Sequence, residues 1–266
     1  MLDITPYPPS SVDTIASDFI RDGFACIADA LTPEQLSFAQ EGARRVVADQ
    51  TGTIPLEKGN RGFARYSFGS QIKHAEWRQL IDLSTVLPVL EKIWGTDAFQ
   101  SSGVGGDYSL PGARIQHLHA DIHDPLNDPL GKLHIMDLPS PFIVVNFLVT
   151  DFTPENGPTR FIRGTQRSRH PIPGLDEEPE WMKGLIMCAP AGTAIVRDVR
   201  CWHGGTENRS DGQRVMISSG YTASWFRLPR SAGSLDFDIY QTLSARSKSL
   251  CASIVRLPDV KDPHAR

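Results

Sequence analysis

The sequence predicts a mainly β fold with flanking helices, because its residue pattern changes near position 97. Before that point helical periodicity prevails, whereas beyond it short apolar or alternating runs are separated by Gly, Pro, Asn and Asp. Many short strands between dense turn signals are typical of a β-sandwich or barrel and not of alternating strand–helix units. With 266 residues, the chain is long enough to bury a substantial core.

The same change in pattern defines the expected organisation of a single domain. We expect a mainly helical part at 1–96, a β-rich core at 97–226, and a C-terminal helix and tail at 227–266. Residues 122–140 combine several Pro with little periodicity, which indicates a long surface loop of the kind that often acts as a lid. Strands are predicted at 24–28, 113–120, 141–150, 159–162, 184–189, 192–199 and 214–221.

The clearest helix is predicted in "LTPEQLSFAQEGARRVVADQ". Thr32 is a good N-cap, Pro33 suits the first helical position, and Gln35 can complete a capping box. The buried face of this helix is marked by apolar residues at helical spacing, namely Leu36, Ala39, Ala43 and Val46. Further helical segments are predicted at about 75–94 and at 235–250.

Composition excludes several classes of partner. A formal net charge of −4 gives no electrostatic basis for binding nucleic acid or an anionic membrane. No apolar run approaches the roughly 20 residues of a membrane span, and the N-terminal sequence does not read as a secretory signal. The sequence does not define the oligomeric state, and a homo-oligomer is one of the alternatives. A cytoplasmic location is expected, because no C-x-x-C pair occurs among Cys26, Cys188, Cys201 and Cys251.

The stretch "GARIQHLHADIHD" at 112–124 raises the question of a metal site. His119 and Asp121 are two residues apart, which puts both side chains on one face of a strand. A third ligand is expected from His203, which follows an apolar strand and precedes a Gly-Gly turn. Two histidines and one carboxylate suit a non-haem ferrous ion that activates dioxygen. A hydrolytic zinc site stays open, whereas structural zinc is disfavoured because no cysteine pair accompanies the histidines.

Arg214, eleven residues after His203, separates these alternatives. If "GGTENRSDGQ" is a hairpin loop, His203 and Arg214 end and begin neighbouring antiparallel strands. The arginine would then lie near the metal but too far back to ligate it. Its planar guanidinium matches a carboxylate through two parallel hydrogen bonds, so a 2-oxo-dicarboxylic acid could chelate iron and reach Arg214. The competing interpretation of a lone arginine is a surface ion pair.

Three blocks now occur in a recognisable order: "QHLHAD", "DFTPENGPTRFIRGTQR" and "RDVRCWHGGTENRSDGQR". On these blocks the chain resembles the phytanoyl-CoA dioxygenase family of iron(II)/2-oxoglutarate oxygenases, from about Asp18 to Tyr221. The resemblance implies a double-stranded β-helix, that is, a cupin-like jelly roll flanked by helices. It also implies one oxygenase domain in which iron(II) is held by His119, Asp121 and His203.

The resemblance further implies a binding site for 2-oxoglutarate, which is consumed together with O2. Arg214 would hold this cosubstrate, and Thr159 and Gln116 would be its hydrogen-bond partners. Arg65 resembles an arginine that some members add from the N-terminal region, although Arg61 competes for this assignment.

The implied function is the oxidation of a small-molecule metabolite by hydrogen abstraction. Hydroxylation is the leading expectation, with desaturation, cyclisation and epimerisation as alternatives. Asp121 argues against halogenation, because related halogenases need that carboxylate to be absent. Two other classes stay open: a metal-dependent hydrolase or isomerase that uses the same triad, and a jelly-roll ligand-binding protein without catalytic activity.

The substrate pocket is expected under the 122–140 loop and the 60–73 segment. The coenzyme A ester of the family's namesake is not carried over, since no basic cluster suited to it is present. The sequence departs from the family at 163–166, where Arg163-Gly164-Thr165-Gln166 replaces Pro-Gly-Ser/Thr-His, and Arg163 is a hypothetical substrate or lid contact. Candidates for the apolar walls are Phe63, Tyr66, Phe68 and Trp225.

Overall fold

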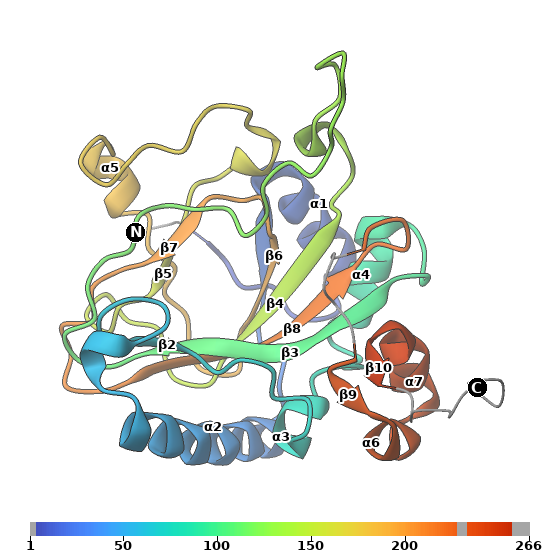
Figure 1. The fold of residues 1–266 in the computed structure, drawn as a ribbon, viewed down its shortest axis with the longest axis horizontal. Coiled ribbons are helices and arrows are strands. Elements are labelled where there is room, and N and C mark those ends of the chain that lie inside the picture. The colour runs from blue at the N-terminus through green and yellow to red at the C-terminus, as the bar shows by residue number, and fades with distance from the viewer. Residues whose placement is uncertain (1–3, 228–232, 257–266) are drawn as a thin grey trace, which may run out of the picture.

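The architecture is a six-stranded antiparallel sheet that faces a two-stranded sheet across a cavity (Figure 1). The computed structural model describes residues 4–227 and 233–256. In spatial order, the large sheet consists of β1 (Phe24–Ile27), β6 (Ala194–Asp198), β4 (Phe142–Leu148), β8 (Arg214–Thr222), β3 (Gln100–Ser109) and β2 (Arg65–Ser67). The small sheet pairs β5 (Thr159–Phe161) with β7 (His203–Gly205). This arrangement is the mainly β jelly roll that the sequence predicts.

Helices cover the outer face of the large sheet, and α2 runs along it below β3 in Figure 1. The helices associated with this sheet are α1 (Val12–Asp22), α2 (Pro33–Thr53), α3 (Ala75–Arg78), α4 (Leu87–Trp94), α6 (Phe237–Gln241) and α7 (Ala245–Cys251), whereas α5 (Glu180–Lys183) lies on the side of the small sheet. Shorter elements are the 3-10 turns Leu56–Lys58, Ile135–Asp137, Thr165–Arg167 and Ala252–Ile254, and the parallel pair β9 (Leu235–Asp236) and β10 (Val255–Arg256). No helix in the described ranges is long and apolar enough to cross a membrane.

Strand alternation decides which side chains reach the cavity. On β4, Val145 and Phe147 enter the hydrophobic core under the helices, whereas Val144 and Asn146 point to the opposite face and line the cavity. The neighbouring strand β8 follows the same rule, with Val215 and Ile217 in the core and Arg214, Met216 and Ser218 in the cavity. One face of the large sheet is therefore structural and the other is available for chemistry.

The helix predictions are confirmed with shifted boundaries. Thr32 Oγ1 accepts a hydrogen bond from the backbone N–H of Gln35 at 3.2 Å, and the Gln35 side chain accepts one from Thr32 N–H at 2.9 Å. The segment 75–94 divides into α3 and α4, and α4 ends at Gly95 in the left-handed conformation. The helix predicted at 235–250 is two short helices instead, α6 and α7. Of the C-terminal part predicted at 227–266, residues 228–232 and 257–266 lie outside the described residues.

The strand predictions are confirmed for β1, β4, β5, β6 and β8 but are wrong for two segments. Residues 113–120 pair with β7 only at an isolated bridge between His119 and His203, and residues 184–189 likewise form only isolated bridges. The sequence did not predict β3 as a strand, because "QSSGVGGDYS" is rich in Gly and Ser and lacks apolar alternation. It is extended because β8 and β2 bind it from both sides.

The expected hairpin between His203 and Arg214 is also wrong. His203 begins β7 in the small sheet, whereas Arg214 begins β8 in the large sheet. The connection at 206–213 therefore crosses from one sheet to the other. The two residues line the same cavity from opposite walls, so a molecule bound between the sheets could contact both.

Candidate metal centre and cosubstrate pocket

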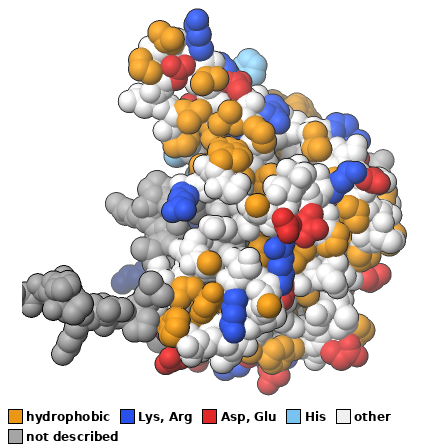
Figure 2. Space-filling view, turned by 90° about the vertical axis from the view of Figure 1, so that its right-hand side faces the viewer, with side chains coloured by type: hydrophobic (Ala, Val, Ile, Leu, Met, Phe, Trp, Pro, Cys, Tyr) orange, Lys and Arg blue, Asp and Glu red, His pale blue; other side chains and the backbone are white. Residues whose placement is uncertain are grey.

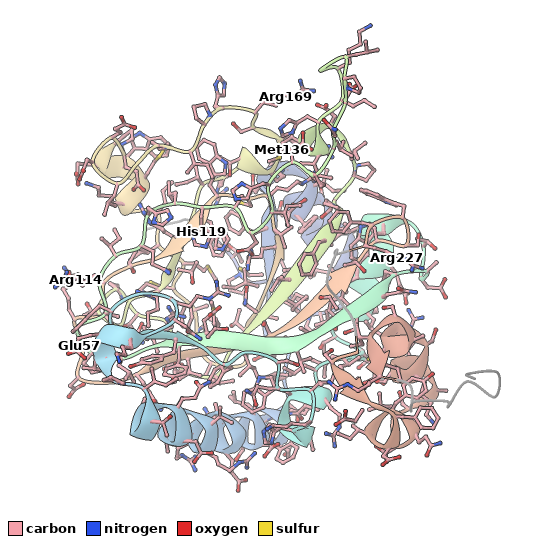
Figure 3. All side chains as sticks on the ribbon, viewed as in Figure 1. Glu57, Arg114, His119, Met136, Arg169 and Arg227 are labelled. Atoms are coloured by element: carbon pink, nitrogen blue, oxygen red, sulfur yellow. The ribbon has the colours of Figure 1, made fainter. Side chains whose placement is uncertain are left out.

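His119, Asp121 and His203 come together in the described structure as a group that could hold a metal ion. Asp121 Oδ1 lies 3.8 Å from His119 Nε2 and 3.6 Å from His203 Nε2. Backbone pairing causes this approach, because His119 and His203 exchange N–H···O hydrogen bonds of 2.9 and 3.0 Å. Figure 3 shows His119 beside β7, and its side chain is partly exposed. A single bridge thus places both imidazoles side by side.

Each imidazole is held by its second ring nitrogen. His203 Nδ1 lies 2.9 Å from the carbonyl oxygen of Cys201, and His119 Nδ1 lies 3.3 Å from that of His117. A carbonyl oxygen can only accept, so these contacts put the ring proton on Nδ1 and leave Nε2 with a free lone pair. Both Nε2 atoms face Asp121. The tautomer with its proton on Nδ1 is the one that a metal ligand requires, because its Nε2 lone pair is free.

Electrostatics keeps the three groups in their metal-binding protonation states. Burial, followed by the charge of Arg197, lowers the pKa of His203 to about 3, and burial also lowers that of His119. Burial by itself would raise the pKa of Asp121, but Arg197 and His203 outweigh it and hold that pKa well below its usual range. At neutral pH the group therefore presents two neutral nitrogens and one carboxylate, a donor set that fits ferrous iron.

Arg197 reaches this centre from the large sheet. Its Nη1 lies 2.6 Å from Asp121 Oδ2, and its Nε donates to Asn146 Oδ1 at 3.0 Å. Arg197 is on β6 and Asn146 is on the neighbouring β4, so the guanidinium is supported by two paired strands. The carboxylate oxygen that faces away from the imidazoles thus has a cationic partner.

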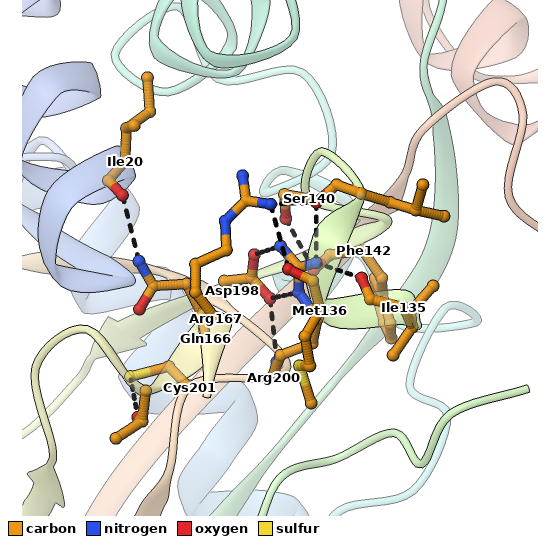
Figure 4. Close-up of polar contacts among 12 residues, drawn as sticks. Ile20, Ile135, Met136, Ser140, Phe142, Gln166, Arg167, Asp198, Arg200 and Cys201 are labelled. Atoms are coloured by element: carbon orange, nitrogen blue, oxygen red, sulfur yellow. Dashed lines mark hydrogen bonds and ion pairs between the residues drawn. The ribbon is translucent and has the colours of Figure 1, made fainter. Parts of the chain in front are cut away.

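The segment that follows Asp121 is anchored at its base and protrudes at its tip. The buried Arg200, paired with Asp198, donates from Nη1 to the carbonyl oxygens of Ile135 at 2.6 Å and Leu138 at 3.0 Å (Figure 4). Residues 122–140 form the predicted loop, with one 3-10 turn, and Figure 2 shows apolar side chains on the protrusion. The exposed apolar residues of this loop are Leu126, Leu130 and Leu133.

A cavity of about 420 Å³ holds the triad between the two sheets. Its remaining wall is predominantly polar and cationic. The lining side chains from the large sheet and its edge are Arg61, Arg65, Asp107, Phe142, Val144, Asn146, Arg197, Arg214, Met216 and Ser218, and those opposite include Gln116 and Thr159.

Arg214 lines this cavity while almost fully buried. Its Nε donates to the carbonyl oxygen of Gly157 at 3.1 Å, and its guanidinium carbon lies 5.1 Å from the centre of the Phe152 ring. Its Nη1 has no hydrogen-bond partner, and among residues 4–227 and 233–256 no carboxylate comes within ion-pair distance of it. Burial and the neighbouring Arg65 lower the pKa of Arg214 to about 9. A buried cation with a spare donor fits the distal carboxylate of a 2-oxo-dicarboxylic acid.

The structure brings the other predicted cosubstrate residues to the same cavity. Gln116 accepts from the backbone N–H of Gly205 at 2.9 Å, and Arg65 donates from Nη2 to the carbonyl oxygen of Thr206 at 2.7 Å. A Cβ on Gly205 would come within 3 Å of the ends of the Arg65 and Gln116 side chains, so both would have to shift. Thr159 is buried on β5 directly opposite Gly205, and within the described residues its hydroxyl has only the sulfur of Met216 at 4.0 Å as a partner.

Two sequence expectations about the pocket are corrected by the packing. Tyr66 and Phe68 do not line the cavity: Tyr66 stacks on Tyr108 in the hydrophobic core, and the Phe68 ring packs against Tyr108 at a tilt. Arg163 forms an ion pair with Asp22 at 3.2 Å beside the N-terminal helix, and it does not line the cavity that holds the triad. The apolar wall of that cavity is instead provided by Phe142, Val144 and Met216.

Sequence reasoning missed three polar residues of this cavity. Arg197 and Asn146 stand within otherwise apolar strands, and a charge or amide inside such a run was the available signal. Asp107, on the unpredicted strand β3, lies with Oδ1 3.4 Å from Arg61 Nε, and burial raises its pKa. No sequence signal pointed to Asp107, because the strand that carries it was not recognised.

A sequence model of the phytanoyl-CoA dioxygenase (PhyH) family matches residues 19–216 of this protein. The chain belongs to the phytanoyl-CoA dioxygenase family. This family assignment covers both sheets up to the first residues of β8, and therefore includes every member of the triad as well as Arg214.

Several solved structures of similar fold contain 2-oxoglutarate together with a second small molecule. EctD from S. alaskensis, with 2-oxoglutarate and 5-hydroxyectoine, is 21% identical over 85% of this chain and 81% of that chain, with a TM-score of 0.62. HygX from Streptomyces hygroscopicus, with nickel, 2-oxoglutarate and hygromycin B, is 14% identical over 85% and 90%, with a TM-score of 0.61. The epimerase SnoN from nogalamycin biosynthesis, with Fe3+, alpha ketoglutarate and nogalamycin RO, is 15% identical over 84% and 91%, with a TM-score of 0.60. At these identities the likeness shows the shared fold.

Proposed function

We propose that this protein is an iron(II)- and 2-oxoglutarate-dependent oxygenase that oxidises a small-molecule metabolite. The observation that carries the proposal is the meeting of two features in one cavity: a His-Asp-His group with free donor atoms, and the buried Arg214 with an unpartnered N–H donor. The first suits ferrous iron, and the second suits the far carboxylate of a keto acid that chelates it. Membership of the phytanoyl-CoA dioxygenase family supports the same activity.

Each residue has a defined task in this proposal. His119, Asp121 and His203 hold the metal and leave coordination positions for the keto acid and O2. Arg214 binds the distal carboxylate, and Thr159, Gln116 and Arg65 shape and polarise the same end of the cavity. When bound, iron and 2-oxoglutarate supply the oxidising power, derived from O2, that hydrogen abstraction from an unactivated carbon needs.

The substrate is proposed to enter beside the metal along the wall of Phe142, Val144 and Met216. The cavity is of the size that small ligands occupy, and its polar lining suits a functionalised metabolite. Hydroxylation is the proposed outcome, and desaturation, cyclisation or epimerisation would use the same first step. Hygromycin B and nogalamycin RO in structures of similar fold support a natural-product type of substrate. The four unpaired cysteines fit the proposed cytoplasmic location.

An anaerobic titration tests the proposal directly. Ferrous iron is added under nitrogen with and without 2-oxoglutarate, and the weak visible charge-transfer absorption of the iron–keto acid chelate is recorded. We expect the band only when both are present, and we expect His203→Ala to abolish it. Absence of the band in the wild-type protein would exclude the proposed oxygenase. Turnover of a substrate without 2-oxoglutarate or O2 would instead assign the triad to a hydrolase or isomerase.

A further inference from the structure

The carboxylate of Asp121 is held differently at its two oxygens. Oδ1 faces both imidazoles, 3.8 and 3.6 Å from their Nε2 atoms, whereas Oδ2 is 2.6 Å from Nη1 of Arg197. The Arg197 side chain is only 9% exposed, although it lies on the wall of a polar cavity. One oxygen is thus directed to the metal position and the other to a buried cation.

Arg197 is itself fixed by the large sheet. Its backbone on β6 pairs with β1 on one side and with β4 on the other. Its Nε donates to Asn146 Oδ1 on β4 at 3.0 Å, which sets the plane of the guanidinium. Its Nη1 meets Asp121 Oδ2 as a close ion pair and not as an aligned hydrogen bond. A planar guanidinium that is fixed by Asn146 cannot follow the carboxylate if the carboxylate rotates.

Asp121 needs such support more than the two histidines do. Each histidine ring is oriented by a carbonyl two residues away in its own segment, Cys201 or His117. Asp121 instead begins the long segment 122–140, and apart from its backbone N–H bond to Val199, its partners are side chains. Its orientation therefore depends on a group from a different part of the chain.

We propose that Arg197 is a positioning residue that makes Asp121 a one-oxygen metal ligand. It holds Oδ2 against the sheet, so that Oδ1 alone is presented to the metal. A carboxylate that chelated through both oxygens would occupy a further coordination position, one that the keto acid or O2 requires. This inference rests on the proposed function. It concerns how coordination positions on the metal are kept free for the keto acid and O2.

Partners of metal ligands beyond the ligand atoms themselves typically change metal affinity or activity by about 10- to 100-fold when they are removed. Arg197→Met removes the charge and both donors but keeps most of the aliphatic stem. Arg197→Lys keeps a charge but cannot contact Asn146 and Asp121 in one fixed plane. Arg200→Met is the matched control, because Arg200 is also buried and paired with an aspartate nearby but does not line the cavity.

The experiment uses cobalt(II) as a spectroscopic substitute for iron, without and then with 2-oxoglutarate. In Arg197→Met we expect cobalt affinity to fall about 10- to 100-fold and the visible ligand-field bands to change in shape. Arg197→Lys should show a smaller change in the same direction, and Arg200→Met should keep the wild-type bands even if its melting temperature falls. Circular dichroism of each metal-free variant checks that it folds.

The outcomes separate this inference from the proposed function. If the wild-type protein binds neither cobalt nor iron at the triad, the proposed function fails. If wild type binds metal and 2-oxoglutarate but Arg197→Met keeps wild-type affinity and bands, only the role of Arg197 is overturned. A loss confined to 2-oxoglutarate affinity would overturn it too, because Arg197 would then contact the keto acid. Should Arg197→Met not fold, wild-type affinity and bands in Arg197→Lys would be the overturning result.

Discussion

Two buried arginines, one in each sheet, differ in whether a carboxylate of the protein pairs with them. Arg160, on β5 in the small sheet, carries its own anion: Glu178 accepts from both terminal nitrogens of its guanidinium, and both side chains are 0% exposed. Arg214, on β8 in the large sheet, is 1% exposed and has a backbone carbonyl and the face of Phe152 around it, with no carboxylate at ion-pair distance in the described part of the chain.

The difference supports the proposal that Arg214 binds an anionic ligand, whereas Arg160 already has its counter-ion within the protein. A buried charge without a counter-ion is costly, so it is retained where something outside the chain completes it. The Arg160–Glu178 pair is complete, and it also fixes the segment before His119, because Leu118 N–H donates to Glu178 Oε1 at 3.2 Å. At Arg214, the depressed pKa reflects burial and the nearby Arg65, a situation that a dicarboxylate would relieve.

The largest predicted effect is on the complete pair. Glu178→Gln leaves Arg160 charged and buried, so we expect the free energy of unfolding to fall by about 3–5 kcal/mol. Urea denaturation of the metal-free protein measures this change. Glu180→Gln is the control, because the Glu180–Lys183 pair is exposed and its loss should be small. A loss below about 1 kcal/mol in Glu178→Gln would show that the Arg160–Glu178 pair contributes no more to stability than an exposed ion pair does.

The next effect should fall on ligand binding alone. Arg214→Met removes the proposed partner of the distal carboxylate, which typically costs about 1.5–3 kcal/mol, or roughly 10- to 150-fold in 2-oxoglutarate affinity. The substitution breaks no internal ion pair and removes only the hydrogen bond to Gly157 and the contact with Phe152, so the unfolding free energy should fall by less than in Glu178→Gln. Calorimetric titration and urea denaturation measure the two quantities. A stability loss as large as that predicted for Glu178→Gln would contradict the view that Arg214, unlike Arg160, has no internal counter-ion.

Stabilisation of the fold by 2-oxoglutarate gives a second test of whether Arg214 binds the ligand. In the metal-loaded wild-type protein, 2-oxoglutarate at ten times its Kd should stabilise the fold by about 1.4 kcal/mol through mass action. At that same concentration Arg214→Met should show little stabilisation, whereas Arg163→Met, altered outside the cavity, should respond as wild type does. Thermal unfolding with and without the ligand gives both values. Equal shifts in wild type and Arg214→Met would move the anchor to another residue.

The smallest predicted effect is a pH dependence of unfolding caused by His203. The two arginines do not contribute to it, because both stay charged in acid. Since the pKa of His203 is lowered from 6.5 to about 3, chiefly by burial, the unfolded chain binds the proton first as the pH falls. Stability from this group is therefore present above pH 6.5 and is lost below it, by about 1 kcal/mol between pH 6.5 and 5.5. His203→Gln should flatten the pH dependence of unfolding in the metal-free protein, and an unaltered slope would contradict the assignment.

Local sequence signals were sufficient where the determining interactions are local. The capping box at Thr32 and Gln35 lies within one turn of chain, and it was predictable from those residues. The apolar runs at 141–150 and 192–199 likewise became β4 and β6, since burial on both faces favours such runs as strands. The strand β3 was not predictable, because its Gly- and Ser-rich residues are extended only through pairing with β8 and β2.

The sequence by itself predicted a mainly β fold, the candidate ligands His119, Asp121 and His203, and Arg214 as a candidate carboxylate partner, because these predictions depend on residue type and short spacing. The jelly-roll class followed from the resemblance to a known family. Tertiary structure alone decided that His203 and Arg214 face each other from different sheets, and that Arg197 and Asn146 reach the carboxylate of Asp121. The reason is physical: a pattern along one strand defines its two faces, but only the packing of sheets defines which distant side chains share a cavity.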